Sequence, residues 1–141
     1  MTTEPKFIPE TAVPLQLEGG GECRVRLIDC VGYMVEGAMG HEENDKPRMV
    51  KSPWFEQEVP FDLAAETGTR KVICEHSTIG IVVTTDGSVS DIPREGYART
   101  EKRIVEELDA LGKPYIILLN STHPDAPETK QLAEGMARDY D

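Results

Sequence analysis

The sequence has 141 residues, which is enough for one ordinary domain with an apolar core. Its formal net charge is −11, from 26 acidic and 15 basic side chains, and this excludes the clustered lysines and arginines of a nucleic-acid-binding surface. No apolar run approaches the roughly 20 residues of a membrane-spanning helix, and three cysteines without framework spacing predict reduced thiols in a cytosolic protein.

Residues 11–29 are expected to form a β-hairpin. Val13, Leu15 and Leu17 alternate with polar residues, and a second alternating segment covers residues 22–29. The three consecutive glycines between the two segments can adopt the positive φ of a tight turn. The pattern therefore predicts two antiparallel strands at the edge of a sheet.

Residues 30–60 show no sustained periodicity and are predicted to form a long, switch-like loop. Loops of this length inside compact domains are uncommon and often functional. A helix is expected to begin just after Pro60 and to cover residues 61–74. Its small and apolar face consists of Phe61, Ala65, Gly68 and Val72.

The remaining segment, residues 78–138, is expected to read strand, helix, strand, helix, with the elements at 78–85, 93–111, 115–119 and 127–138. Both strands are apolar runs with little alternation, which is typical of strands covered on both faces. Two such strands joined by a helix predict a parallel sheet with helices on its faces. The predicted fold is therefore α/β, a three-layer, mostly parallel sheet.

The helix at 93–111 carries an apolar stripe that one acid interrupts. Tyr97, Ile104, Leu108 and Leu111 fall on one side, and Glu101 stands among them. Gly112 follows at the position where a helix end favours positive φ.

Ligands of parallel α/β sheets bind outside the carboxyl ends of the strands, so the residues at these ends are candidate site residues. They are Asp29, the run Thr84-Thr85-Asp86, and the pair Asn120-Ser121.

Asp29 and Gly32 form a D-x-x-G pattern where a strand gives way to the long loop. An acid at this place can hold the water shell of Mg²⁺, and the glycine lets a backbone amide approach a terminal phosphate. Two hydroxyl residues upstream, Thr2 and Thr3, could coordinate Mg²⁺ and sense the γ-phosphate. The alternatives are an ordinary strand-end acid and a frayed terminus, since a four-residue pattern is common by chance.

A third element, Asn120-Ser121-Thr122-His123, follows the second apolar strand. Nucleotide hydrolases that use the D-x-x-G pattern and bind GTP have Asn-Lys-x-Asp at this place. The aspartate of that motif accepts two N–H bonds from guanine. This sequence keeps the asparagine but has serine and histidine at the lysine and aspartate positions, which weakens a GTP assignment and leaves ATP open. No segment matches G-x-x-x-x-G-K-[ST], the loop that supplies phosphate-binding amides and a lysine.

The sequence resembles the nucleotide-hydrolase domain of the stage IV sporulation protein A family, the spore-coat morphogenetic ATPases of endospore-forming bacteria. The likeness covers the whole chain. It rests on MTTEPKF at residues 1–7, RLIDCVGY at 26–33, PRM at 47–49 with PW at 53–54, GTRKV at 68–72, EHSTIG at 75–80, TTDG at 84–87 and GKP at 112–114.

The resemblance implies a partial P-loop NTPase domain over residues 1–141 that lacks the first strand, the P-loop and the first helix. A chain truncated at both ends is expected to be inactive alone. Thr2 and Thr3 would be sensor threonines, Asp29 the Walker B-type acid and a metal-binding residue with Thr3, and Gly32 and Asn120 nucleotide-binding residues. Tyr33 stands where many hydrolases have the glutamine that positions water.

Further implications concern the intact family protein. It would use ATP and Mg²⁺ to drive self-association into polymers, the basement layer of the spore coat. That layer would lie in the mother-cell cytoplasm at the forespore outer surface, with a small amphipathic membrane-anchoring protein and other coat proteins as partners and no nucleic acid. The alternative is a non-catalytic interaction module of the coat, whose contacts Trp54, Phe55 and Met49 could anchor.

Overall fold

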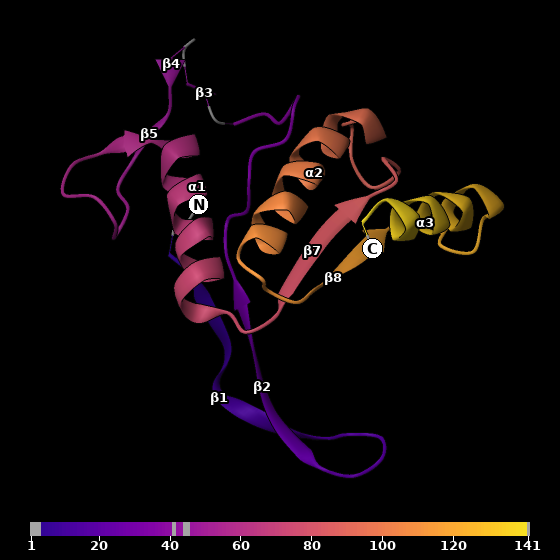
Figure 1. Cartoon of the computed structure of the whole chain (residues 1–141). Coiled ribbons are helices and arrows are strands. Elements are labelled where there is room, and N and C mark those ends of the chain that lie inside the picture. Colours follow the sequence, from indigo (N-terminus) through magenta and orange to yellow (C-terminus); the bar gives the residue numbers. More distant parts are fainter. Residues whose placement is uncertain (1–3, 41, 44–45, 141) are drawn as a thin grey trace. The chain divides into compact units, whose positions relative to one another are not determined.

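The computed structural model describes residues 4–40, 42–43 and 46–140. The chain divides into two compact units: Met1–Tyr33 with His41–Ser77 form the first, and Met34–Gly40 with Thr78–Asp141 form the second. The secondary structure is mixed α/β, as predicted, and the strands in the described ranges pair as four two-stranded sheets. Figure 1 shows the elements of both units along the chain. Within the described residues, no helix is long and apolar enough to cross a membrane.

The predicted hairpin opens the first unit. Strands β1 (Lys6–Gln16) and β2 (Glu22–Asp29) are antiparallel, from the pair Lys6↔Asp29 to the pair Gln16↔Glu22. The turn glycines have φ values of 92°, 93° and 111°, as expected for residues without a Cβ. Strand β1 begins five residues before the predicted start, because an irregularity between Ile8 and Val13 breaks the alternation of its first half.

Two short antiparallel pairs interrupt the long loop that follows β2. Strand β3 (Glu42–Glu43) pairs with β4 (Lys46–Pro47), and β5 (Met49–Val50) pairs with β6 (Val59–Pro60). Strands of two residues are too short to show a periodic pattern, so they could not be predicted from the sequence.

Helix α1 (Phe61–Lys71) begins directly after β6 and continues into a π-helical turn, η1 (Val72–His76). The predicted face is confirmed, because all four of its residues are buried. The two ends of that face, Phe61 and Val72, are 5% and 4% exposed.

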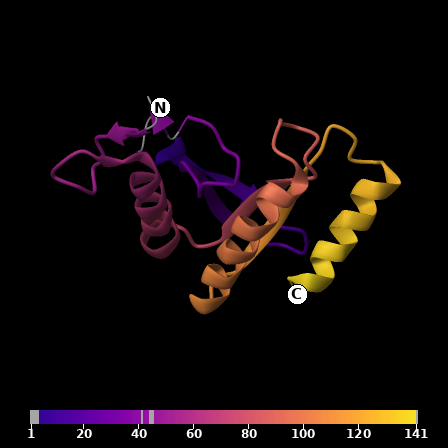
Figure 2. The ribbon, with the colours of Figure 1, turned by 90° about the horizontal axis from the view of Figure 1, so that it is seen from above.

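The second unit is built on a parallel pair. Strands β7 (Gly80–Thr85) and β8 (Tyr115–Asn120) align from Gly80↔Tyr115 to Thr85↔Asn120, and α2 (Arg94–Ala110) connects them. Helix α2 packs closely on β7, since a methyl group added at Gly80 would lie 3.1 Å from the Leu108 side chain. Helix α3 (Pro127–Asp139) follows β8, and Figure 2 shows the two helices beside the strands. The predicted strand, helix, strand, helix order is therefore present.

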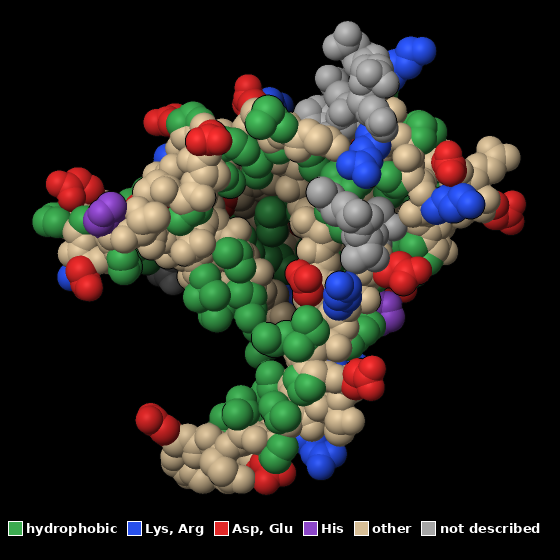
Figure 3. Space-filling view, turned by 180° about the vertical axis from the view of Figure 1, so that it is seen from behind, with side chains coloured by type: hydrophobic (Ala, Val, Ile, Leu, Met, Phe, Trp, Pro, Cys, Tyr) green, Lys and Arg blue, Asp and Glu red, His purple; other side chains and the backbone are tan. Residues whose placement is uncertain are grey.

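Among the residues that the structure describes, only one face of the β7–β8 pair is covered, so the expectation of coverage on both faces is wrong. Val82 is 6% exposed under α2, whereas Val83 is 68% and Ile116 is 53% exposed on the other face. A run of β-branched residues indicates a strand, but whether a face of that strand is buried depends on which other elements pack against it. Figure 3 shows apolar side chains at the surface on the side turned away from the viewer of Figure 1.

The buried stripe of α2 differs from the predicted one at its end. Leu108 is 1% and Val105 is 4% exposed, but Leu111 lies at the helix end and is 48% exposed. Glu101 is as deeply buried as its apolar neighbours, at 2%. Gly112 has the expected positive φ, 62°. The acid in the stripe is therefore a buried group that needs partners.

Candidate functional site

The D-x-x-G pattern lies where β2 ends and the long loop begins. Asp29 is the last residue of β2 and is exposed. Within residues 4–40, 42–43 and 46–140, no hydrogen bond or ion pair to its carboxylate is present. The Gly32 amide donates to the Thr69 hydroxyl of α1 at 3.0 Å. A phosphate that binds this amide would therefore have to replace the Thr69 hydroxyl.

The backbone conformation at position 32 explains why a glycine stands there. Gly32 has φ of +84°, a conformation that residues with a Cβ rarely adopt, and no atom of the described residues lies within 4 Å of the place where a Cβ would stand. Any other residue at position 32 would have a strained backbone. The space beside the glycine is open, so a ligand could approach the backbone closely.

The residues present at the β2 end suit an ion that keeps its water shell. A single exposed carboxylate offers hard oxygen donors, and Mg²⁺ commonly binds through one or two carboxylates while retaining waters. Among the described side chains, no group of three or more metal-ligating residues occurs. Thr2 and Thr3, the other residues predicted here, lie outside the described residues.

The second predicted group lies at the carboxyl ends of β7 and β8. Asn120 is exposed at the end of β8 and pairs with Thr85 across the ladder. Its carbonyl accepts the Asp86 amide at 3.2 Å. The ends of the two strands are thus joined beyond the last ladder pair. Asn120 belongs to the second unit, whereas Asp29 and Gly32 belong to the first.

Asp86 is the centre of a hydrogen-bond network at this edge. One carboxylate oxygen accepts the Ser88 amide at 2.9 Å and the Ser88 hydroxyl at 2.6 Å. The other accepts the Thr129 hydroxyl of α3 at 3.3 Å. Hydrogen bonds from the Ser121 side chain, then from Ser88 and Thr129, hold the pKa of Asp86 well below its usual range. The carboxylate is therefore ionised and already occupied by donors of the protein.

The same network binds the loop after β8 to the loop after β7. The Thr122 amide donates to the Ser88 hydroxyl at 2.9 Å, and the His123 amide donates to the Ser121 hydroxyl at 2.9 Å. The Thr122 hydroxyl and His123 Nδ1 lie 2.9 Å apart. Residues 121–123, which stand at the base-reading positions predicted from the sequence, are thus fixed by protein contacts.

A buried ion pair lies deeper in the second unit. Arg94 binds both carboxylate oxygens of Glu101 at 2.7 Å, and the Tyr140 hydroxyl donates to the same carboxylate at 2.8 Å. Arg94 also reaches the Thr84 hydroxyl at 3.4 Å. The Tyr115 hydroxyl donates to the Tyr140 carbonyl at 3.2 Å. These contacts join the start of α2, the end of α3 and both strands.

The electrostatics of this pair follow from burial and donors. Burial opposes ionisation of Glu101, but hydrogen bonds from Arg94, Thr84 and Tyr140 outweigh it and hold its pKa below the usual value. The hydrogen bond to Glu101 raises the pKa of Arg94. Burial, and then the bond to Glu101, raise the pKa of Tyr140 to about 12. All three groups therefore keep one protonation state near neutral pH.

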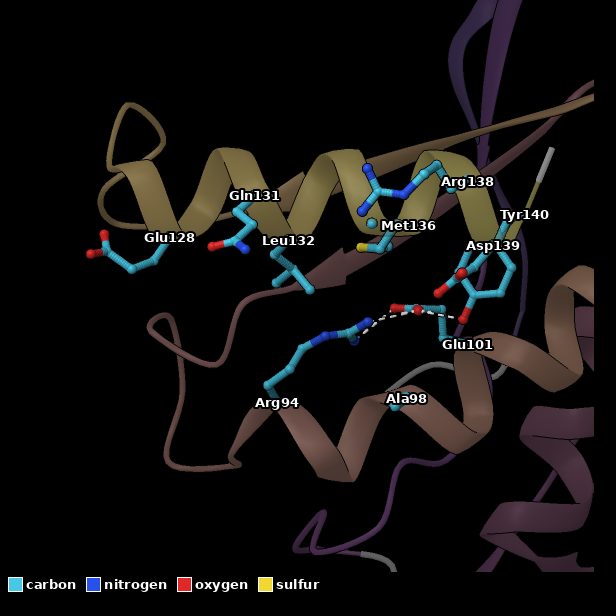
Figure 4. Close-up of a pocket in the computed structure, with 11 residues that line it drawn as sticks. Arg94, Ala98, Glu101, Glu128, Gln131, Leu132, Met136, Arg138, Asp139 and Tyr140 are labelled. Carbon is cyan, nitrogen blue, oxygen red and sulfur yellow. Dashed lines mark hydrogen bonds and ion pairs between the residues drawn. The ribbon is translucent and has the colours of Figure 1, made fainter.

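An open cavity of about 500 Å³ lies between α2 and α3. Figure 4 shows Arg94 and Glu101 reaching into it from α2, with Leu132 and Met136 of α3 on the opposite side. Its lining is mixed, and its polar floor is an ion pair whose donors and acceptors are already matched. The cavity therefore offers less for a nucleotide than the strand ends do.

Sequence reasoning marked the strand ends but missed several partners. Ser88, Thr129, Arg94 and Tyr140 were not singled out. Only Glu101 gave a usable signal, since an acid within an apolar stripe requires a buried partner.

The parallel strand pair with its crossover helix makes the second unit α/β and is compatible with part of a P-loop NTPase-like domain. The model of the family "Stage IV sporulation protein A, ATPase domain" matches residues 1–141, and the chain belongs to this family.

Three curated relatives are each named stage IV sporulation protein A. The chain is 52% identical to the protein from Bacillus anthracis, 50% to that from Bacillus subtilis (strain 168) and 48% to that from Clostridioides difficile (strain 630), in each case over all 141 residues. The chain spans 29% of the length of each relative. No solved structure matches it.

Proposed function

We propose that this chain is the part of a sporulation ATPase that carries the magnesium-organising acid and the base-side loop. In the intact protein, Mg²⁺-dependent ATP hydrolysis would drive self-assembly of the spore coat basement layer. The observation that supports this most directly is Asp29, an acid at a strand end with no described partner on its carboxylate, three residues before a positive-φ glycine. Membership of the ATPase-domain family supports the same proposal.

Different residues of the chain would bind the metal ion, the phosphates and the rest of the nucleotide. Bound Mg²⁺ would supply charge neutralisation for the phosphates. Asp29 would hold the water shell of that ion, with Thr2 or Thr3 as its hydroxyl partner. The Gly32 amide would turn from Thr69 to the terminal phosphate. The family likeness assigns Asn120 a nucleotide-binding role as well.

ATP fits the base-side loop better than GTP. Guanine recognition in this class needs a carboxylate that accepts two N–H bonds, and Ser121 and His123 stand at the lysine and aspartate positions. Asp86 lies nearby but is saturated by Ser88, Ser121 and Thr129. A guanine would therefore lose a charge-assisted pair, whereas adenine needs none.

Partners and location follow from the family only as proposals. The intact protein would self-associate into polymers in the mother-cell cytoplasm, at the forespore outer surface. A small amphipathic membrane-anchoring protein and other coat proteins would be its partners.

A non-catalytic interaction module of the coat is the second candidate. It is favoured by two features of the long loop. Met49 is 50% exposed, and the Trp54 Nε1 atom is buried without a hydrogen-bond acceptor among the described residues. Met49 could contact a partner directly, whereas Trp54 Nε1 would reach a partner's acceptor only after the loop rearranges.

A chimera separates the two candidates. The chain replaces the matching 141 residues of the Bacillus subtilis relative, and phosphate release from Mg·ATP is measured with and without Asp29→Asn. We expect the chimera to hydrolyse ATP and Asp29→Asn to lose about 100-fold of the rate. Asp109→Asn, an exposed acid on α2, is the matched control and should change nothing. A chimera that assembles without hydrolysing ATP would favour the interaction module.

A further inference from the structure

We infer that Asp86 is a positioning residue, whose carboxylate sets the conformation in which the loop at 121–123 meets the nucleobase. The inference rests on the proposed function and deepens it. It assigns no contact between Asp86 and the nucleotide, because the donors of the protein already occupy the carboxylate.

The Ser88 hydroxyl links Asp86 to Thr122. The Ser88 Oγ atom lies 2.6 Å from the Asp86 carboxylate and 2.9 Å from the Thr122 amide. A hydroxyl has one proton, and a carboxylate only accepts, so that proton points at Asp86. The lone pairs of Ser88 Oγ are then free to accept the Thr122 amide. Asp86 thus fixes the hydroxyl orientation on which the contact to Thr122 depends.

The network also connects the loop after β7 to the loop after β8. The Thr122 amide and the Ser88 hydroxyl are 34 residues apart in the chain, and Thr129 attaches the first turns of α3 to the same carboxylate. Ser121 contributes a further hydrogen bond to it. The segment between the end of β8 and the start of α3 is therefore tied at both ends to one side chain.

Asp86 does not support the core of the second unit. The β7–β8 ladder from Gly80↔Tyr115 to Thr85↔Asn120 and the packing of α2 hold the strands without Asp86. The network lies outside the last ladder pair, at the edge where ligands of such sheets bind. Loss of the carboxylate should thus loosen the loops and leave the sheet intact.

The first experiment uses the chain alone and measures amide hydrogen exchange. In Asp86→Ala we expect the Thr122 amide to exchange about tenfold faster, as for a lost hydrogen bond, while the Ile117 amide in β8 stays unchanged. Asp86→Asn keeps one acceptor oxygen and should give a smaller change. Asp91→Asn, an exposed acid in the same loop, is the control. Unchanged Thr122 exchange in Asp86→Ala would overturn the inference.

The second experiment measures ATP hydrolysis by the chimera. We expect Asp86→Ala to raise KM for ATP about tenfold with kcat changed less than about threefold, and Asp86→Asn to recover part of the affinity. An equal loss in kcat with an unchanged KM would overturn the positioning role. An unsubstituted chimera without ATPase activity would overturn the proposed function and the nucleotide part of this inference, while amide exchange would decide the loop contact independently.

Discussion

The strand ends of β2 and β7 both carry an aspartate, but the two acids have opposite surroundings. Asp29 is exposed, and no donor among the described residues reaches its carboxylate. Asp86 accepts from Ser88 at 2.9 and 2.6 Å and from Thr129 at 3.3 Å. A carboxylate that the protein leaves open can take an ion, whereas one that the protein saturates organises its neighbours. Similar sequence positions therefore support different roles.

The anchoring behind the two ends differs as well. At the β2 end, one hydrogen bond from Gly32 to Thr69 joins the loop to α1. Behind the β7 end, Arg94, Glu101 and Tyr140 form a buried cluster that joins two helices. We expect the β2 end to change shape on ligand binding more easily than the β7 end, because fewer contacts oppose the change.

The largest expected effect sharpens the contrast between the acids. In the chimera, Asp29→Asn should reduce ATP hydrolysis about 100-fold, because the ion's water shell loses its anionic acceptor. In the isolated chain, the same substitution should change the free energy of unfolding by less than about 0.5 kcal/mol, as for an exposed surface residue. Urea denaturation followed by circular dichroism measures this. A large loss of stability would show that Asp29 is a structural acid.

Removal of the buried acid behind β7 should give the next largest effect. Glu101→Gln leaves the half-buried Arg94 without its ionic partner and should lower the free energy of unfolding by about 3 kcal/mol in urea. Tyr140→Phe is the matched variant, because it removes only one hydrogen bond and should cost about 1 kcal/mol. Equal effects of the two substitutions would contradict the central place of Glu101.

A smaller effect is expected at the β2 end. Thr69 is 5% exposed and accepts the Gly32 amide, so Thr69→Val should lower the free energy of unfolding by about 1 kcal/mol. Thr69→Ser keeps the hydroxyl and serves as the control. In the chimera, Thr69→Val should lower KM for ATP if the hydroxyl competes with phosphate for the amide. A raised KM would mean that Thr69 helps to hold the nucleotide.

The smallest expected effect concerns pH. The folded-state pKa of Asp86 is depressed, so its contribution is present above the unfolded value of about 3.9 and is lost only as pH falls through the lower folded value. The protection factor of the Thr122 amide should therefore stay constant from about pH 8 to 5. Side-chain carboxyl shifts in an NMR titration check the assignment. A transition of Asp86 near pH 5 would contradict the network.

Local patterns made most elements predictable. Alternation and three glycines predicted the hairpin, and the run of elements from residue 78 onward predicted the parallel pair with its two helices. Both signals arise from neighbours within a few residues. Asp29, Gly32 and Asn120 were placed at strand ends for the same reason. The structure finds them there, and their catalytic and binding roles stay predictions.

The missed features depend on residues distant in the chain. Arg94 and Glu101 stand seven residues apart and therefore lie on one face of the helix. Their spacing is a signal in the sequence from which the pair could have been predicted. Tyr140 meets Glu101 from 39 residues away, and Ser88 meets Thr122 across 34. The exposed face of β7–β8 was missed because an apolar run shows preference for a strand and says nothing of what covers it.

The tip of the β1–β2 hairpin has a practical consequence. Gly19, Gly20 and Gly21 all have positive φ, and nothing lies within 4 Å of a Cβ built at any of them. Exposed tips of small residues tolerate insertions, so a fluorophore-binding tag of a few residues should fit there with the paired strands undisturbed. Such a label would give the proposed assembly of the intact protein an optical signal while both acid-bearing strand ends keep their native sequence.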